Sequence, residues 1–344
     1  MPRTLHLDAF NPADLAHAAT LLQNGRLVAF ATETVYGLGA HALSHEAVAS
    51  IFAAKQRPSW DPLIVHLASA AQLGSITRIP DALAPRISAL TTAFWPGPLT
   101  LLLPRTALIP DAVTSGRELV GVRVPSHPSA HALLAAAGLP IAAPSANTFG
   151  HTSPTTAAHV LADLDGRIDA VLDAGPTSIG LESTVLDPTQ TPMILYRPGA
   201  VTADQLTAAT GVPIELFIPA NSATADHPAS LPSPGVGIRH YAPRARLILV
   251  DGTAAALTLA LNQLPSHTPS AVGILLPQGW PPPHDAILHP WGHWTDPEAL
   301  AAGLFSGLRA LDDTGVSTIL CPLPPPGGLA DAIRDRLQKA ARTA

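Results

Sequence analysis

Cysteine, aromatic residues and charge are all scarce in this chain. Its 344 residues include one cysteine, Cys321, which excludes an internal disulfide and a cysteine-rich metal site. One cysteine is typical of a reducing compartment, and we expect Cys321 to be a small buried side chain. Charged residues make up 13% of the chain and the formal net charge is −6, so the basic excess of a nucleic-acid-binding domain is absent.

Long hydrophobic runs are also missing, although 47% of the residues are hydrophobic. The run over residues 133–143 is interrupted by Gly138 and Pro140, well short of the length of a membrane span. The first residues contain an acidic side chain and no apolar segment typical of a signal peptide. We therefore expect a cytoplasmic protein that makes no contact with a membrane.

The signatures of common nucleotide-binding loops do not occur. Gly37 and Gly39 begin a GxG, but Ala42 stands where the dinucleotide fingerprint needs glycine, and there is no GxxxxGK[ST]. The GxSxG elbow of one class of serine hydrolases is absent too. If the chain binds a nucleotide, side chains and ordinary loop amides must hold the phosphates.

Two α/β patterns are present, separated by an irregular connector. Residues 1–212 alternate short β-rich runs with helices expected near 44–55, 80–94, 127–137 and 155–164, and strands that adjoin without a helix predict a mixed sheet. Residues 213–245 are mostly rich in Pro, Ser, Ala and Gly without apolar periodicity. Residues 246–344 predict a small parallel sheet with helices near 253–264, 297–313 and 329–341.

A basic residue ends the helix expected at 44–55. Ser44 is a plausible N-cap, and Val48, Ile51 and Phe52 form an apolar stripe that Lys55 continues. The Lys55 stem should thus lie along the core while its ammonium group reaches a neighbouring cleft. A cation that only stabilises the helix C-terminus is the alternative explanation.

Further polar residues follow Lys55 within KQRPSWDPLIVH. Arg57 offers a planar fork for phosphate oxygens, Asp61 offers an acceptor, and His66 can donate or accept near neutral pH. His66 has apolar neighbours in a strand, so a satisfied core histidine is equally compatible with the sequence.

Other polar groups occur where strands are expected to end. Arg123 is flanked by valines in GVRVP and must meet an anion or a cluster of acceptors. The remaining candidates are hydroxyl, amide and guanidinium groups in short turns: Thr34, Ser145, Asn147, Ser153, Ser183 and Arg197. Each turn by itself could be an ordinary loop rich in Ser, Asn and Gly.

Taken in order, these motifs resemble the YrdC-like domain over nearly all of residues 10–205. They are TETVYGLG, KQRPSWDPLIVHL, FWPGPLTLLL, GVRVP, PSAN, LESTV and YRPGA. SPGVGIRHYAP and the second α/β pattern are similar to the longer, two-domain threonylcarbamoyl-AMP synthases. The resemblance implies a YrdC-like twisted mixed sheet with helices and a smaller Rossmann-like parallel α/β domain.

The family forms L-threonylcarbamoyladenylate and pyrophosphate from L-threonine, bicarbonate and ATP, which is nucleotidyltransferase chemistry. A tRNA threonylcarbamoyl transferase complex uses the product to modify the adenosine beside the anticodon. By similarity, threonine and its carbamate are expected at Thr34, His66, Arg123, the backbone near Ala143, and Ser183. ATP is expected at Lys55, Arg57, Asp61, the backbone near Leu119, Ser145, Asn147, Ser153 and Arg197. Lys55 and Arg57 are the pair expected to act on the phosphates.

The connector is the candidate active-site lid, because the carbamate and the mixed anhydride both react with water. In the longer family members this segment folds back over the site, and Arg239, His240 and Tyr241 match its RHYAP core. Gly237 and Ile238 stand where the family usually has Lys and Tyr.

The resemblance implies Mg²⁺ on the ATP phosphates, while no metal cage of the protein's own is expected. His41 and His45 are four residues apart, but Ser44, the expected helix cap, lies between them, so they should not share a helix face. Two rival functions stay open: a module that binds tRNA or double-stranded RNA, and a relative that makes carbamoyl adenylate from carbamoyl phosphate. The low net charge argues against tight binding of nucleic acid, and the extra domains of such carbamoyl-transferring relatives are absent.

Overall fold

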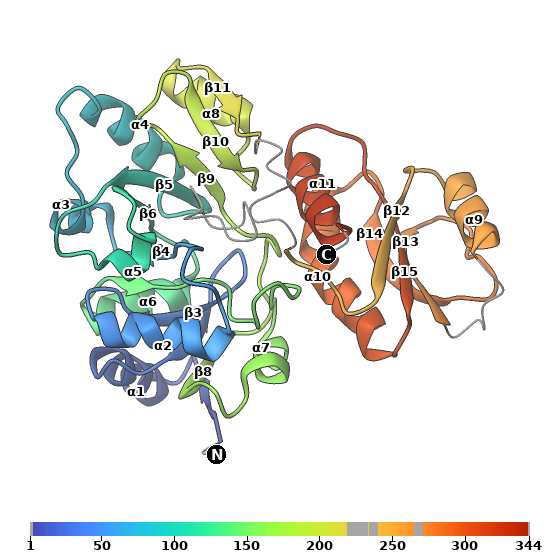
Figure 1. The fold of residues 1–344 in the computed structure, drawn as a ribbon, viewed down its shortest axis with the longest axis horizontal. Helices are drawn as coiled ribbons and strands as arrows, with labels where there is room; N and C mark the ends of the chain where they lie inside the picture. The colour runs from blue at the N-terminus through green and yellow to red at the C-terminus, as the bar shows by residue number, and fades with distance from the viewer. Residues whose placement is uncertain (1–2, 219–232, 234–239, 265–270, 343–344) are drawn as a thin grey trace. The chain divides into compact units, whose positions relative to one another are not determined.

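The computed structural model describes residues 3–218, 233, 240–264 and 271–342, and the chain divides into two compact units (Figure 1). The first unit comprises Met1–Phe149, Pro154–Ser178 and Glu182–Gly237. The second comprises Gly150–Ser153, Ile179–Leu181 and Ile238–Ala344. Two short segments from the middle of the chain therefore belong to the C-terminal unit.

The first unit is built on an eleven-stranded sheet, and this sheet is mixed, as predicted. Its order is β1-β8-β2-β3-β7-β4-β6-β5-β9-β10-β11. The β1/β8, β2/β8, β4/β6, β5/β9 and β10/β11 pairs are parallel, and the other five are antiparallel. The strands are β1 (Leu5–Asp8), β2 (Val28–Ala31), β3 (Tyr36–His41), β4 (Ile64–His66), β5 (Leu99–Pro104), β6 (Leu119–Arg123), β7 (Ile141–Ala142), β8 (Ala170–Asp173), β9 (Thr184–Asp187), β10 (Met193–Arg197) and β11 (Ile214–Leu216).

Helices cover both faces of this sheet. They are α1 (Pro12–Gln23), α2 (His45–Lys55), the 3₁₀ turn η1 (Ala70–Gln72), α3 (Leu73–Ile76), α4 (Ala84–Phe94), α5 (Asp111–Thr114), α6 (Pro128–Ala137), α7 (Ala157–Leu164) and α8 (Ala203–Thr210). Buried residues of α1 and α6 form one cluster with Val28 and Phe30 of β2. The neighbouring Ala29 and Ala31 belong to the larger cluster on the opposite face, which includes residues of α2, α4, α7 and α8. The alternation follows from the two-residue period of a strand.

Helix α2 begins and ends where the sequence predicts. The Ser44 hydroxyl accepts a hydrogen bond from the Ala47 amide, so it caps the helix N-terminus as expected. Val48 and Ile51 are fully buried in the larger cluster, and Phe52 packs against it. After Lys55 the backbone of Gln56 turns left-handed with φ 54°, which ends the helix. Lys55 is therefore the last helical residue and its stem lies in the core.

Some boundaries differ from the prediction. Helix α4 begins at Ala84 and not near residue 80, because the Leu83 and Ala84 amides first close tight turns onto the Pro80 carbonyl. Strand β3 was not foreseen as a separate strand, because the glycine-rich YGLG has a low strand propensity. It forms because β2 and β7 pair with it on both sides.

The second unit contains a four-stranded parallel sheet of order β12-β15-β13-β14, as predicted. Its strands are β12 (Arg246–Val250), β13 (Val272–Gln278), β14 (Ile287–His293) and β15 (Thr318–Pro322), and its helices are α9 (Ala254–Gln263), α10 (Pro297–Asp313) and α11 (Leu329–Ala340). Helix α9 lies on one side of the sheet and α10 and α11 on the other (Figure 1). Cys321 is buried in β15, as expected, and burial raises the pKa of its thiol.

None of the helices in the described ranges combines the length and the apolar character that crossing a bilayer requires.

Candidate active site

One face of the β4–β10 half of the large sheet carries polar side chains. Val65 of β4, Leu101 of β5 and Val122 of β6 belong to the large hydrophobic cluster. Their neighbours His66, Thr100 and Arg123 must point to the opposite face, because successive side chains of a strand alternate. His66 and Arg123 are register partners on adjacent strands. The predicted His66 and Arg123 thus lie side by side.

Arg123 is buried and contacts groups from two other motifs. Its Nη1 donates to the Thr34 hydroxyl at 2.9 Å, and its Nε donates to the Gly97 carbonyl at 3.2 Å. Its Nη2 forms an ion pair with Glu33 Oε1 at 2.6 Å. The strand arginine therefore finds the cluster of acceptors that the sequence requires.

Glu33 is the acidic partner that the predicted residue set lacks. Burial would raise the pKa of its carboxyl, but Arg123 and the nearby backbone amides of Glu33 and Ser126 hold it below the ordinary value. The signal was present in the sequence, because Glu33 lies inside TETV and Arg123 needs an anion. The sequence does not show, however, that Glu33 of TETV and Arg123 of GVRVP pair in the folded protein.

His66 is buried but is not a satisfied core histidine. Its Nδ1 has no hydrogen-bond partner among the residues that the structure describes. Burial and the Arg123 guanidinium lower the pKa of His66 to about 3. The imidazole is therefore neutral at physiological pH and offers a neutral polar group beside Arg123.

The Lys55 side chain contacts a loop outside its own helix. Its Nζ donates to the Ser145 carbonyl at 2.6 Å and to the Asn147 carbonyl at 2.5 Å, in the PSAN loop about ninety residues later. These contacts do not fit a cation that only stabilises its own helix end. Burial and the Arg57 guanidinium hold the pKa of Lys55 well below its ordinary value. Lys55 is thus brought next to the backbone of Ser145 and Asn147.

Arg57 and Asp61 form a buried pair beside Lys55. Arg57 Nη2 lies 2.9 Å from Asp61 Oδ2, and the same side chain donates to the Asp61 and Pro62 carbonyls. Burial raises the pKa of Asp61 despite the opposing charges of Arg57, Lys55 and Arg197. Asp61 Oδ1 has no hydrogen-bond partner among the described residues, so it can still accept from a ligand.

Arg197 enters the site through an irregularity in β10. Leu195 pairs with Leu186, whereas Arg197 pairs with Val185, so one extra residue lies between the two pairs. Because cross-strand partners share a face, this bulge turns Arg197 from the core face to the face of Thr100. Arg197 then donates to the Ser183 carbonyl at 3.0 Å and to its hydroxyl at 3.2 Å. The Ser183 hydroxyl also contacts Thr100, which sequence analysis missed inside an apolar run.

The remaining predicted residues have other surroundings. The Ala143 amide donates to the Ile64 carbonyl, so it takes part in backbone hydrogen bonding with β4. Leu119 begins β6, four residues before Arg123, and packs beside Val185. Ser153 is fully buried and belongs to the second unit.

Two of the three predicted lid residues fall within the described ranges. Tyr241 is a buried residue of the second unit with φ 64°, and its ring lies 5.8 Å from the Phe305 ring and 5.2 Å from the Arg336 guanidinium. The His240 ring contacts Tyr241 edge to face. Arg239, Gly237 and Ile238 lie outside the described residues.

Contacts join the motifs of the first unit into one network. The Leu38 amide donates to the Pro144 carbonyl, and the Ala146 amide donates to the Tyr36 carbonyl, which ties TETVYGLG to PSAN. The Gly97 amide donates to the Val124 carbonyl, and the Thr184 amide donates to the Pro98 carbonyl.

In the part of the chain that the structure describes, there is no group of three or more His, Cys, Asp or Glu side chains that could hold a metal ion.

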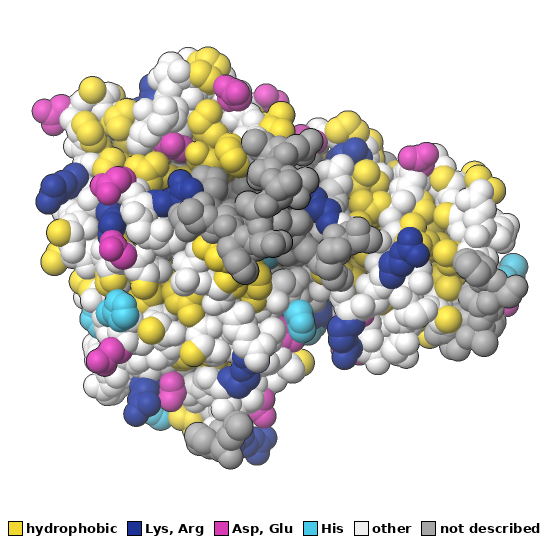
Figure 2. Space-filling view, in the orientation of Figure 1, with side chains coloured by type: hydrophobic (Ala, Val, Ile, Leu, Met, Phe, Trp, Pro, Cys, Tyr) yellow, Lys and Arg dark blue, Asp and Glu magenta, His cyan; other side chains and the backbone are white. Residues whose placement is uncertain are grey.

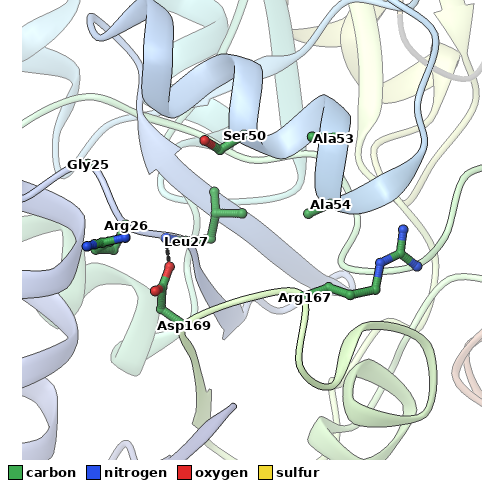
Figure 3. A pocket seen from close by; sticks show the side chains of 8 residues that line it. All are labelled: Gly25, Arg26, Leu27, Ser50, Ala53, Ala54, Arg167 and Asp169. Carbon is green, nitrogen blue, oxygen red and sulfur yellow. Dashed lines mark hydrogen bonds between the residues drawn. The ribbon is translucent and has the colours of Figure 1, made fainter. Parts of the chain in front are cut away.

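A separate pocket of about 450 Å³ contains none of the predicted residues (Figure 3). It is lined by Gly25, Arg26, Leu27, Ser50, Ala53, Ala54, Arg167 and Asp169. Asp169 accepts a hydrogen bond from the Leu27 amide, and Arg167 donates to Thr148. Asp169 and Arg167 are thus used in contacts between loops. The candidate site is therefore the polar network that contains Arg123 and Lys55.

The fold and the site define a two-unit α/β protein with buried charged groups on its large mixed sheet. A family model described as "Telomere recombination" matches residues 20–199, and one described as "Threonylcarbamoyl-AMP synthase, C-terminal domain" matches residues 201–342. The chain belongs to the threonylcarbamoyl-AMP synthase family.

Individual relatives agree with this assignment over almost the whole chain. The threonylcarbamoyl-AMP synthase of Bacillus subtilis is 42% identical over 96% of this chain and 94% of its own length. The one from Pyrococcus abyssi is 39% identical over 94% of this chain and 93% of its own length. The crystal structure of P. abyssi Sua5 complexed with L-threonine superposes with a TM-score of 0.86 at 38% identity, covering 98% of this chain and 97% of that one.

Proposed function

We propose that the chain forms threonylcarbamoyl-AMP and pyrophosphate from L-threonine, bicarbonate and ATP. The family assignment supports an enzyme with ATP and L-threonine as substrates. The observation that carries the proposal is that one network holds two sets of buried charged groups, Arg123 with Glu33 and Lys55 with Arg57 and Asp61. Two charged substrates need two such sets.

The chemistry is a nucleotidyl transfer. The threonine ammonium group first loses a proton, and the free amine then forms a carbamate with bicarbonate and releases water. A carbamate oxygen then bonds to the α-phosphorus of ATP while the bond to pyrophosphate breaks. Negative charge grows on the phosphoryl oxygens and on the leaving pyrophosphate, and preorganised Lys and Arg donors stabilise it. Lys55 and Arg57 would serve in this way without acting as a covalent nucleophile or as an acid–base pair.

The residues divide between the two substrates as the family resemblance implies. Threonine and its carbamate would contact Thr34, His66, Arg123, Ala143 and Ser183. ATP would contact Lys55, Arg57, Asp61, Leu119, Ser145, Asn147, Ser153 and Arg197. Lys55 donates to loop carbonyls. Phosphate oxygens, which carry more negative charge, would compete favourably for it.

Mg²⁺ would accompany ATP and neutralise part of the phosphate charge. The donors present fit an ion that is held mainly by phosphates and water, because Mg²⁺ commonly takes only one or two carboxylates. Asp61 Oδ1, buried and without a partner among the described residues, is the oxygen that could meet it or a ribose hydroxyl.

We further propose that a tRNA threonylcarbamoyl transferase complex consumes the product, and that the protein acts in the cytoplasm. The single cysteine supports a reducing compartment. Tight binding of nucleic acid by this chain is not expected. On the face shown in Figure 2, Lys and Arg side chains of the first unit alternate with Asp and Glu and form no basic patch among the described residues.

The division into a YrdC-like domain (1–212), a connector (213–245) and a C-terminal domain (246–344) also remains a proposal. The connector, with Arg239, His240 and Tyr241, would act as the lid through the family resemblance. Exclusion of water from a bound carbamate is the physical reason for such a segment.

Pyrophosphate release tests the proposed function. Purified protein with ATP and Mg²⁺ should release pyrophosphate only when L-threonine and bicarbonate are both present, because the carbamate is the nucleophile. Reactions that omit one component at a time are the controls. ATP turnover that is unaffected by omitting threonine would sink the assignment, and a salt-dependent shift of tRNA at sub-micromolar protein without turnover would favour the RNA-binding alternative.

A further inference from the structure

Helix α10 is firmly fixed within the second unit. The Asp296 side chain caps its N-terminus by accepting a hydrogen bond from the Ala299 amide. Pro297 stands in the first turn, where its fixed φ favours the start of a helix. The apolar side of this 17-residue helix is buried, including Leu304 and Phe305. A capped helix with a long buried side offers a fixed surface to the segments that pack on it.

One segment that packs on α10 is residues 179–181. Gly180 is buried, and its backbone is left-handed with φ 77°. A Cβ at this position would lie 2.6 Å from the Ala301 carbonyl oxygen and 2.6 Å from the Ala302 Cα. Only glycine allows so close an approach of two backbones. The segment therefore lies directly against the backbone of α10.

The other segment is residues 150–153. The Arg309 guanidinium of α10 donates to the carbonyl of Thr152, a buried residue. A hydrogen bond from a charged donor is stronger than one from a neutral donor. The Ala242 amide also donates to the Gly150 carbonyl. Helix α10 and the start of the C-terminal part thus hold this segment at two points.

Both contacts use the same side of α10. Ala302 and Arg309 are seven residues apart, which is about two helical turns, so they lie on one side of the helix about 10 Å apart along its axis. The two segments belong with α10 to the second unit. A single helix therefore fixes two segments that lie far apart in the sequence.

The two segments adjoin residues that the proposed function assigns to the substrates. Ser153, proposed to contact ATP, directly follows Thr152. Ser183, proposed to contact threonine and its carbamate, follows Gly180 by three residues. Because consecutive Cα atoms are about 3.8 Å apart, little chain is available to absorb a shift of either segment. The positions of both serines therefore depend on the contacts with α10.

We propose that α10 is a positioning element for the reaction, in which Arg309 fixes the segment that leads to Ser153 and Gly180 fixes the segment that leads to Ser183. The inference rests on the proposed function, which assigns substrates to the two serines. Arg309 and Gly180 are positioning residues that act through their neighbours in the chain. A misplacement of about 1 Å can slow a reaction strongly, even when the change in stability is small. The second unit then contributes to the reaction through α10 as well as through the connector.

Steady-state kinetics of the full chain tests the contact of Arg309. Met in its place keeps a long stem and lacks the donors, so Arg309→Met should raise the KM for ATP about fivefold or more and leave the KM for threonine within about twofold. Arg309→Lys retains a donor and should bring the KM for ATP back to within about threefold of wild type. Arg334→Met is the matched control, because Arg334 donates to the Pro324 carbonyl in the same unit, and it should change neither KM.

Replacement of Gly180 tests the other contact. The added methyl group of Gly180→Ala meets the backbone of α10, so the segment must move. The KM for threonine should rise about fivefold or more, while the KM for ATP stays within about twofold. Gly315→Ala is the matched control. Gly315 has φ 81° and nothing within 4 Å of an added Cβ, so this variant reproduces the backbone strain without the collision and should keep both KM values.

The opposite effects on the two KM values separate positioning from folding. A variant that is partly unfolded has fewer active molecules, which lowers kcat and leaves KM unchanged. A lowered kcat at unchanged KM would therefore overturn the proposal, and so would equal effects of Arg309→Met and Arg334→Met. If Gly180→Ala does not fold, the Arg309 variants still decide.

Failure of the proposed function is recognised separately. A wild type that releases no pyrophosphate with ATP, threonine and bicarbonate refutes that function. Hydrogen exchange of the backbone amides then shows whether α10 fixes the segment. Faster exchange over residues 144–153 in Arg309→Met than in Arg334→Met supports the positioning role, and equal exchange in the two variants overturns it.

Discussion

Lys55 and Arg123 are both buried cations, but different groups balance them. Arg123 has the Glu33 carboxylate in direct contact, whereas Lys55 Nζ contacts two uncharged carbonyls. Burial and Arg57 accordingly lower the pKa of Lys55, and Asp61 opposes this only in part. An anionic ligand would restore a favourable environment for the ammonium form. Bound phosphate would therefore change the environment of Lys55 more than that of Arg123.

Replacement of Lys55 tests this role. Lys55→Ala should lower kcat/KM for ATP by about a hundredfold, roughly 2.7 kcal/mol, because a charge that stabilises the transferring phosphates is lost. Steady-state pyrophosphate release measures the change. Arg26→Ala, which removes an exposed cation from the separate pocket, is the matched control and should stay near wild type. A loss of less than about threefold for Lys55→Ala would return this residue to a structural role at the helix end.

His66 should make stability depend on pH. Its pKa is about 3 in the folded protein and about 6.5 in the unfolded chain, so only the unfolded chain takes up a proton as pH falls from 7 to 5. The resulting stabilisation of the folded state is fully present above about pH 6.5 and is lost as the pH falls toward 3. Between pH 7 and pH 5 the free energy of unfolding should fall by about 2 kcal/mol from this cause.

Chemical unfolding at both pH values checks this. The wild type should lose about 2 kcal/mol relative to His66→Asn on going from pH 7 to pH 5. His45→Asn, at an exposed position, should follow the wild-type profile. Parallel curves for wild type and His66→Asn would show that His66 is not held neutral by burial.

At the scale of elements, strand β3 depends on its glycines. A Cβ on Gly39 would lie 2.9 Å from Phe30 Cε1, 3.0 Å from Ile141 Cγ2 and 3.1 Å from the Val28 carbonyl. The glycine pattern of TETVYGLG thus serves close packing of β2, β3 and β7, which holds the TETV turn and its Glu33 in place. In the sequence, Gly37 and Gly39 begin a GxG that does not complete the dinucleotide-binding fingerprint, because residue 42 is alanine.

Gly39→Ala should destabilise the first unit by about 1–3 kcal/mol, because the contacts come from a strand backbone and two packed side chains that cannot all move away. The midpoint of thermal unfolding of that unit measures it. Gly74→Ala in α3 is the control, since its Cβ would meet nothing within 4 Å. Equal midpoints for the two variants would contradict the packing argument.

Helices were easier to predict than strand faces. Helix α2 was predicted from the Ser44 cap and from the apolar stripe that Lys55 continues, and each of these signals depends on residues three or four positions apart. The face of Arg197 was not predictable in this way, because the bulge in β10 is defined only by its pairing with β9. Without that extra residue Arg197 would point to the core side of the sheet.

At the scale of the whole molecule, the second unit takes two segments from the middle of the chain. Residues 150–153 follow PSAN, and residues 179–181 end at the first residue of LESTV. Within this unit the Ala242 amide donates to the Gly150 carbonyl, and Arg309 donates to the Thr152 carbonyl. Removal of the C-terminal part would therefore deprive residues 150–153 of these contacts.

A chain that ends after Ile218 tests what the rest contributes. It retains β11, which pairs with β10, and the hydrophobic clusters of the large sheet. We expect a protein that unfolds cooperatively but synthesises threonylcarbamoyl-AMP at least about tenfold more slowly than the full chain, because the connector and two segment contacts are gone. Full activity would refute the lid proposal, and loss of the folded state would show that the first unit needs the second.

The sequence by itself determined the family, the two α/β patterns and most candidate residues, because motif order, caps and apolar periodicity are local or additive signals. Only the tertiary structure decided that Lys55 contacts Ser145 and Asn147, that Glu33 balances Arg123, and that a bulge turns Arg197 into the site. These contacts join residues far apart in the chain, and their geometry depends on strand register and face. A shift of one residue reverses the face of a strand, so no local pattern can specify it.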